Sequence, residues 1–199
     1  MTMDTPTLPP RREGAHHDTV SMRCLEQDAD DAYARAVDHF YAVNRWGELN
    51  DSMRTAFQLF DGDGRAVDRR PVEGDRIRID VAGPGSPSAG GYDWVEITGI
   101  ETGPPPAGFH AITIRPCAPP DKPDGAVAHF YNDKSSNTFV LRRLDNCLLA
   151  EVHGRNEVPN TSDVPLLDRA RNELLSLAGR VGLGRIQWQD WADGLLSVI

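Results

Sequence analysis

The sequence predicts an α+β domain. Its core is a curved antiparallel sheet or small open β-barrel of roughly five to seven strands, with an N-terminal helix and two C-terminal helices packed on it. Three observations predict this class. Apolar and charged residues alternate in the middle of the chain, Gly- and Pro-rich stretches separate these short runs, and helical periodicity appears at both ends. Hydrophobic residues make up 39% of the 199 residues, which is enough to build one core.

The chain is expected to divide into a flexible arm over residues 1–20 and a single domain over 21–199. The arm is punctuated by prolines and lacks the charged-then-apolar order of a signal peptide, so a cytoplasmic location is predicted. Within the domain, residues 56–158 are expected to be β-rich and residues 163–199 to form the C-terminal helices. Whether the arm becomes ordered on binding is left open.

Helical spacing predicts a helix over residues 28–41, because its apolar side chains fall on one side. Strands are predicted at 76–81, 92–100, 109–115 and 127–131. The connections between them are rich in Gly and Pro, which favours a meander or a barrel over parallel βαβ units.

The strongest local pattern is a hairpin, in which strands 138–144 and 147–153 flank the turn Asp145-Asn146. A two-residue turn places Leu141 opposite Ala150, Phe139 opposite Val152 and Val140 opposite Glu151. One face of the hairpin then carries the core residues Phe139, Leu141, Leu148, Ala150 and Val152. The other face carries Arg142, Glu151 and His153.

Two helices are predicted at the C-terminus. The first starts near Pro165 and ends at Gly182 or Gly184. The second carries an apolar side that is best interpreted as a lid on the core, formed by Trp188, Trp191, Ala192, Leu195 and Ile199.

Charge and cysteine content exclude several functions. The formal charge of -9, without any basic run, argues against binding to nucleic acid or to an anionic membrane, but it suits a basic protein partner. Cys24, Cys117 and Cys147 are odd in number and far apart, which predicts neither a disulfide framework nor a thiolate zinc site. No metal site and no cofactor are predicted, and the oligomeric state is left open.

The most polar stretch runs from Glu151 to Asn160. If its strand is regular, Glu151, His153, Arg155 and Glu157 project to one face, where they form a set suited to acid–base chemistry on an anionic substrate. The favoured interpretation is a solvated strand face with a cross-strand pair between Arg142 and Glu151. His129 is interpreted first as a hydrogen-bonded structural histidine.

Two fold resemblances follow from these elements. The Gly74-Asp75 turn into a charged alternating strand, followed by the strand around Tyr92 and Trp94, is similar to SH3-like barrels. The long terminal helix against a meander is equally similar to helix-grip ligand-binding folds. The choice between the two topologies is left open, and neither resemblance fixes a function.

The first functional hypothesis is a non-catalytic bacterial binding protein, of the adaptor or immunity type, whose acidic surface engages a protein partner. Its expected contact residues are Tyr92, Asp93, Trp94, Arg155 and Asn156, which lie beside a long loop or in the polar stretch. The alternative is a small-ligand binder or enzyme with a polar pocket in the curved sheet. Its working groups would be His129, Glu151, His153, Arg155 and Glu157. A third hypothesis is a structural subunit that uses the Trp-rich terminal helix.

Overall fold

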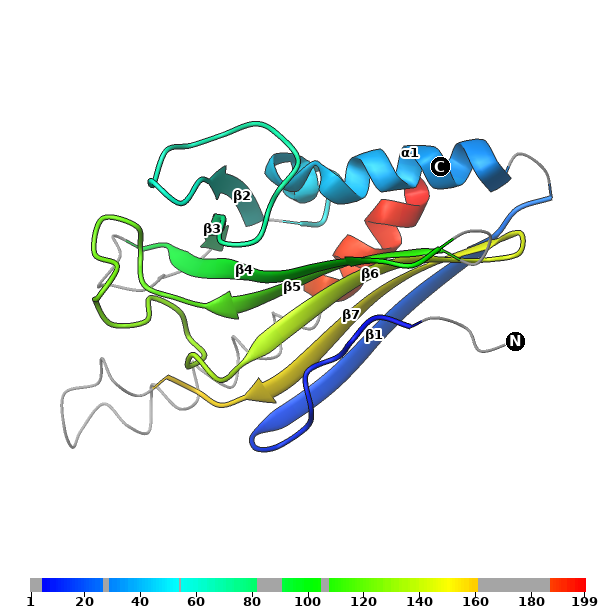
Figure 1. Ribbon diagram of the computed structural model, residues 1–199. Helices are drawn as coiled ribbons and strands as arrows, with labels where there is room; N and C mark the ends of the chain where they lie inside the picture. Colours follow the sequence, from blue (N-terminus) through cyan, green and yellow to red (C-terminus); the bar gives the residue numbers. More distant parts are fainter. Residues whose placement is uncertain (1–4, 27–28, 54, 82–90, 105–107, 161–186) are drawn as a thin grey trace.

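In the described part of the chain, seven strands form one antiparallel sheet. The computed structural model describes residues 5–26, 29–53, 55–81, 91–104, 108–160 and 187–199. The strands are β1 (Ala15–Cys24), β2 (Thr55–Phe60), β3 (Arg76–Val81), β4 (Asp93–Thr102), β5 (Phe109–Pro116), β6 (Ser136–Leu144) and β7 (Cys147–Glu157). Their order in the sheet is β1-β7-β6-β5-β4-β3-β2, so six consecutive strands form a meander and β1 is added beside the last of them (Figure 1).

The hairpin between β6 and β7 has the predicted register. Leu141 pairs with Ala150, Phe139 with Val152 and Val140 with Glu151. Asp145 takes the positive φ of 53° that the tight turn demands. All five side chains predicted for the core face are fully buried.

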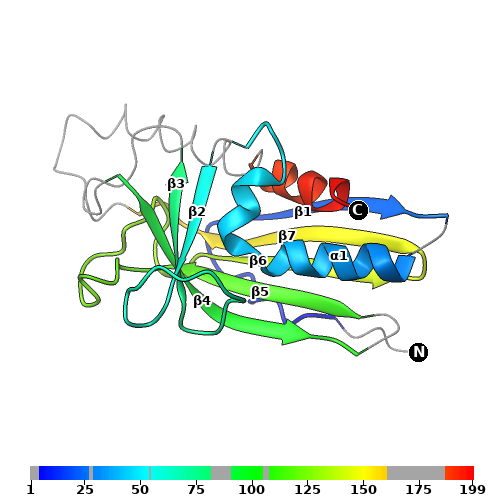
Figure 2. The same ribbon diagram turned by 90° about the horizontal axis from the view of Figure 1, so that it is seen from above.

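The helices of the described residues lie on one side of the sheet, which we call the helix-facing side (Figure 2). They are α1 (Ala29–Tyr41), the 3-10 helix η1 (Val43–Glu48) and a C-terminal helix that includes residues 187–197. Trp46 and Trp191 are fully buried, and their rings pack on Phe139 of β6 with centroids 4.7 and 4.8 Å away. This aromatic contact holds the helices on the sheet. Within the described residues, no helix is both long and apolar enough to cross a membrane.

An open, curved sheet with helices on one side is the helix-grip arrangement, so the SH3-like alternative is set aside. The predicted antiparallel sheet is confirmed. Its seven strands in the described residues are the upper limit of the predicted five to seven. The helix predicted to end at Gly182 or Gly184 lies outside the described residues. The strand predicted at 127–131 is absent, and only Tyr131 makes an isolated bridge there, to Pro159. The backbone groups of that segment bond to separate partners instead of to one strand, since the Ala128 carbonyl accepts from the Trp94 N–H and the Phe130 carbonyl accepts from the Asn160 N–H.

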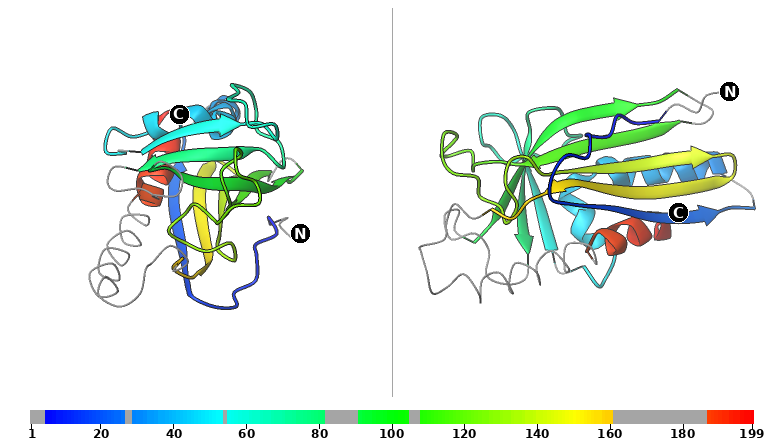
Figure 3. Two further views of the ribbon diagram at one scale, coloured as in Figure 1. Left: turned by 90° about the vertical axis from the view of Figure 1, so that its left-hand side faces the viewer. Right: turned by 90° about the horizontal axis from the view of Figure 1, so that it is seen from below.

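The prediction of a flexible arm over residues 1–20 is wrong for the residues from Ala15 onward. Residues from Ala15 onward form β1, which pairs with β7 along its whole length. Segment 5–14 crosses the other face of the sheet, which we call the outer side (Figure 3). Its contacts there include Thr7 N–H to Glu101 and Asn156 Nδ2 to the Pro10 carbonyl. A second buried apolar cluster, formed by Phe109, Ala111 and Val140, also lies on this side of the sheet.

The prediction of no disulfide is also wrong. Cys24 and Cys147 are directly opposite each other at the end of the β1–β7 ladder and are joined by a disulfide bond across 123 residues of sequence. Sequence spacing did not reveal this pair because the two cysteines meet only through the sheet topology. Cys117 is the free cysteine of the chain.

Candidate functional site

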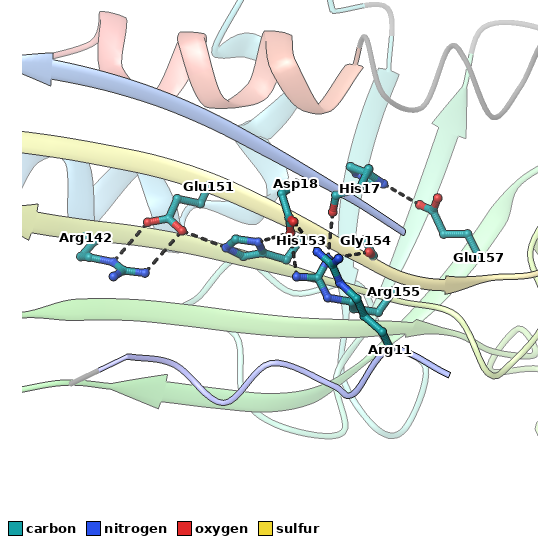
Figure 4. Close-up of polar contacts among 9 residues, drawn as sticks. All are labelled: Arg11, His17, Asp18, Arg142, Glu151, His153, Gly154, Arg155 and Glu157. Atoms are coloured by element: carbon teal, nitrogen blue, oxygen red, sulfur yellow. Dashed lines mark hydrogen bonds and ion pairs between the residues drawn. The ribbon is translucent and has the colours of Figure 1, made fainter. Parts of the chain in front are cut away.

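A network of charged side chains, most of them buried, lies on the outer side of β7 and β1 (Figure 4). His153 is its centre, with Nδ1 2.7 Å from Asp18 and Nε2 2.8 Å from Glu151. Arg142 pairs with Glu151 at 3.1 Å, and Arg155 pairs with Asp18 at 2.6 Å. We call these five residues the outer network. They alternate in charge across three strands. Glu151 lies between Arg142 and His153, and Asp18 pairs with His153, Arg155 and also Arg11, whose guanidinium lies 2.6 Å away.

The neighbours of each group set its protonation state. Burial disfavours the charged imidazole of His153, but the hydrogen bonds to Glu151 and Asp18 outweigh it and raise the pKa of His153. Burial pushes the pKa of Asp18 up, but hydrogen bonds from His153 and Arg155 lower it to about 2. The two carboxylates therefore favour the cationic form of the histidine.

The outer network is structural in character. The predicted Arg142–Glu151 pair is confirmed, but the predicted solvated face is wrong, since Glu151 is 6% and His153 8% exposed. Both ring nitrogens of His153 are occupied by carboxylates. Arg155 donates to the carbonyls of His17 and Gly154 as well as to Asp18, so it ties β1 to β7.

Glu157 does not join the face predicted for it. Asn156 has a positive φ of 56°, and the β1–β7 register shifts between Ala15 and His17. This bulge changes the side to which the following residue points. Glu157 consequently reaches back over Gly154 on the helix-facing side.

There, Glu157 meets His17 in what we call the dyad. His17 Nδ1 lies 2.9 Å from Glu157 Oε1, and the two side chains are only 7% and 2% exposed (Figure 4). Gly154 makes room for this pair, because a Cβ at that position would lie 2.1 Å from His17 Cε1 and 2.6 Å from Glu157 Oε1. Asn137 of β6 pairs with Gly154 from the other side.

The dyad retains unused hydrogen-bonding capacity. Glu157 Oε2, Asn137 Oδ1 and both ring nitrogens of His17 are buried and have no hydrogen-bond partner among the described residues; the 2.9 Å approach of His17 Nδ1 to Glu157 Oε1 is a close ionic contact without hydrogen-bond geometry. A buried polar atom without a partner costs stability and is a common sign of a binding or catalytic role. A carboxylate and an imidazole in contact can also move a proton to or from a bound molecule.

Of the remaining predicted residues, His129 is hydrogen-bonded and 9% exposed. Its Nδ1 accepts a hydrogen bond from the Tyr131 N–H, and burial lowers its pKa to about 3. Asp93 and Trp94 are 7% and 6% exposed at the start of β4, and Trp94 packs on Phe60. Tyr92 is half-buried beneath the Arg78 guanidinium, which lies 4.4 Å from its ring centroid.

Neither a protein-family model nor a curated protein matches this chain. Solved structures do. A hypothetical protein from Helicobacter pylori is 11% identical, with a TM-score of 0.51 over 98% of this chain and 99% of that one. A START superfamily protein from Mycobacterium smegmatis is 12% identical, with a TM-score of 0.39 over 92% and 99%. The di-domain ARO/CYC StfQ from the steffimycin biosynthetic pathway is 12% identical, with a TM-score of 0.39 over 89% and 51%.

The first of these likenesses shows a shared fold. The hypothesis of an adaptor or immunity-type protein is wrong for the contact residues that it named, because four of these five residues are at most 7% exposed. The structure gives a physical reason for the correction. Two of the residues expected to anchor a protein partner, Asp93 and Trp94, are buried inside the domain and offer little surface for contact.

Proposed function

We propose that this chain is a small-ligand-binding protein of the helix-grip type, whose ligand is held on the helix-facing side of the sheet by His17, Glu157 and Asn137. The observation that carries this proposal is the buried dyad with its unused polar atoms. A ligand that offers a hydroxyl, amine or amide group would satisfy Glu157 Oε2 and His17 Nε2 together. The dyad could then also act on that group as an acid or base.

The dyad residues come from β1 and from the end of β7, which the outer network and the disulfide hold together. Both side chains are therefore fixed before a ligand arrives. A preformed site of this kind costs less ordering entropy on binding than a mobile one.

The test is a thermal-shift screen of a small-molecule library against the wild-type chain, Glu157→Gln and Glu48→Gln. Glu48 is an exposed carboxylate of η1 and makes the same chemical change away from the dyad. A true ligand at a hundred times its Kd stabilises the folded protein by about 2.7 kcal/mol. We expect this stabilisation in the wild type and in Glu48→Gln. In Glu157→Gln, loss of a charge-assisted hydrogen bond should weaken binding by roughly 10- to 100-fold.

Each hit is then incubated with the wild-type chain and recovered for NMR analysis. A ligand recovered unchanged identifies a binding protein, whereas conversion that is lost in Glu157→Gln identifies an enzyme. The proposal is overturned if no compound stabilises the wild type, or if hits stabilise Glu157→Gln equally well.

A further inference from the structure

A separate pocket lies on the outer side of the sheet, across from the dyad. Its volume is about 430 Å³. Segment 5–14 contributes Pro9, Arg12 and Glu13 to the lining, and Arg115 of β5 and Lys134 contribute the sheet side. We call this the outer pocket.

Asn156 builds one wall of the outer pocket and fixes segment 5–14. It is 7% exposed, and its Oδ1 accepts hydrogen bonds from the N–H groups of Arg12 and Glu13 at 2.8 and 3.3 Å. Its Nδ2 donates to the Pro10 carbonyl, and its own carbonyl accepts from Ser135. These hydrogen bonds hold the Asn156 side chain in place, so this wall of the outer pocket is formed before any ligand binds.

The charges lining the outer pocket are not balanced. Lys134 is paired with Glu13 at 2.8 Å. The guanidinium groups of Arg12 and Arg115, by contrast, make no hydrogen bond or ion pair with any described residue. Asp133 is the remaining carboxylate of the lining, so three cations stand against two anions.

We propose that the outer pocket binds the oxyanion of a small molecule, a phosphate or carboxylate group, between Arg12 and Arg115. Guanidinium groups present paired N–H donors whose geometry matches both oxyanions. Lys134 remains tied to Glu13 at the rim and supplies positive potential rather than a direct contact. This proposal is independent of the proposed function, because it concerns the opposite side of the sheet.

The test is a titration of the full chain, labelled with ¹⁵N, with sodium phosphate and with sodium acetate at ionic strength held constant with sodium chloride. The backbone amides of Lys134 and Asn156 report on binding. Arg115→Gln and Arg12→Gln should each raise the Kd by about ten-fold or more. Arg65→Gln is the control, because this exposed turn residue loses the same charge and does not line the outer pocket.

Saturable shifts at these two amides, with the expected losses in the two variants and less than about a two-fold change in the control, support the site. Saturation by phosphate or by acetate alone identifies the oxyanion class. The proposal is overturned if the shifts stay linear and match those caused by chloride. It is also overturned if Arg115→Gln binds as the wild type does.

Discussion

Replacing Gly154 by alanine inserts a methyl group into the dyad. The new Cβ would lie 2.1 and 2.2 Å from His17 Cε1 and Nδ1, and 2.6 Å from Glu157 Oε1, all well inside van der Waals contact. Gly154 does not have a positive φ, so the backbone itself accepts alanine and space alone requires glycine. Overpacking of a buried site costs about 1–3 kcal/mol, and three such contacts put this change at the upper end, near ~3 kcal/mol.

Urea unfolding measures that loss, and a double-mutant cycle assigns it to the dyad. In a His17→Ala background the imidazole is gone, so Gly154→Ala should cost less than about 1 kcal/mol. Gly99→Ala is the matched control, because its Cβ would meet only Thr113 at 3.9 Å. If Gly154→Ala is as stable as the wild type, or costs the same in both backgrounds, the close packing described for the dyad is refuted.

Three further predictions concern the sheet that carries both sites. Because the pKa of His153 is raised in the folded state, its stabilisation is complete below the unfolded pKa of 6.5 and is lost as pH rises through the higher folded value. Unfolding free energies measured from pH 6 to 9 should thus fall in the wild type and stay flatter in His153→Gln; parallel curves would disprove the cation assignment. Opening the loop between Cys24 and Cys147 with Cys24→Ser should cost about 4–5 kcal/mol in denaturant unfolding, and an unchanged midpoint would contradict a formed disulfide. Asn156→Ala removes three hydrogen bonds to segment 5–14, at a cost of about 2–3 kcal/mol, and should speed tryptic cleavage there; equal cleavage rates would show that Asn156 does not anchor the segment.

The hairpin and the alternating strands were predictable because each has one apolar face. The side that packs on the helices is marked in the sequence by the apolar residues Phe139, Leu141 and Val152. A two-residue turn then fixes the register of the hairpin. The outer side of the same strands was predicted as solvent-facing, since sequence alone does not show that segment 5–14 folds back across it. This is why the Arg142–Glu151 pair was foreseen and its burial was not.

β1 and the dyad were missed for a related reason. On the helix-facing side β1 carries His17 and Thr19, while its apolar Val20 and Met22 are exposed on the outer side, so the usual alternation signal is inverted. The position of Glu157 depends on a bulge, which the regular alternation of side chains along a strand does not predict. Asn156, which tolerates a positive φ, was the one local clue to that bulge.

The placement of β1 beside β7 has a consequence for biosynthesis. Asp18 leaves the ribosome 135 residues before His153, its partner in the sheet. At about 5–20 residues per second, that interval lasts roughly 7–27 s, during which the strand that becomes β1 has no partner in the sheet. The meander can assemble from local contacts as it emerges, but the N-terminal strand must wait for the end of β7. The first strand to be synthesised is therefore the last to join the sheet, and its arrival completes the dyad and the outer network in one step.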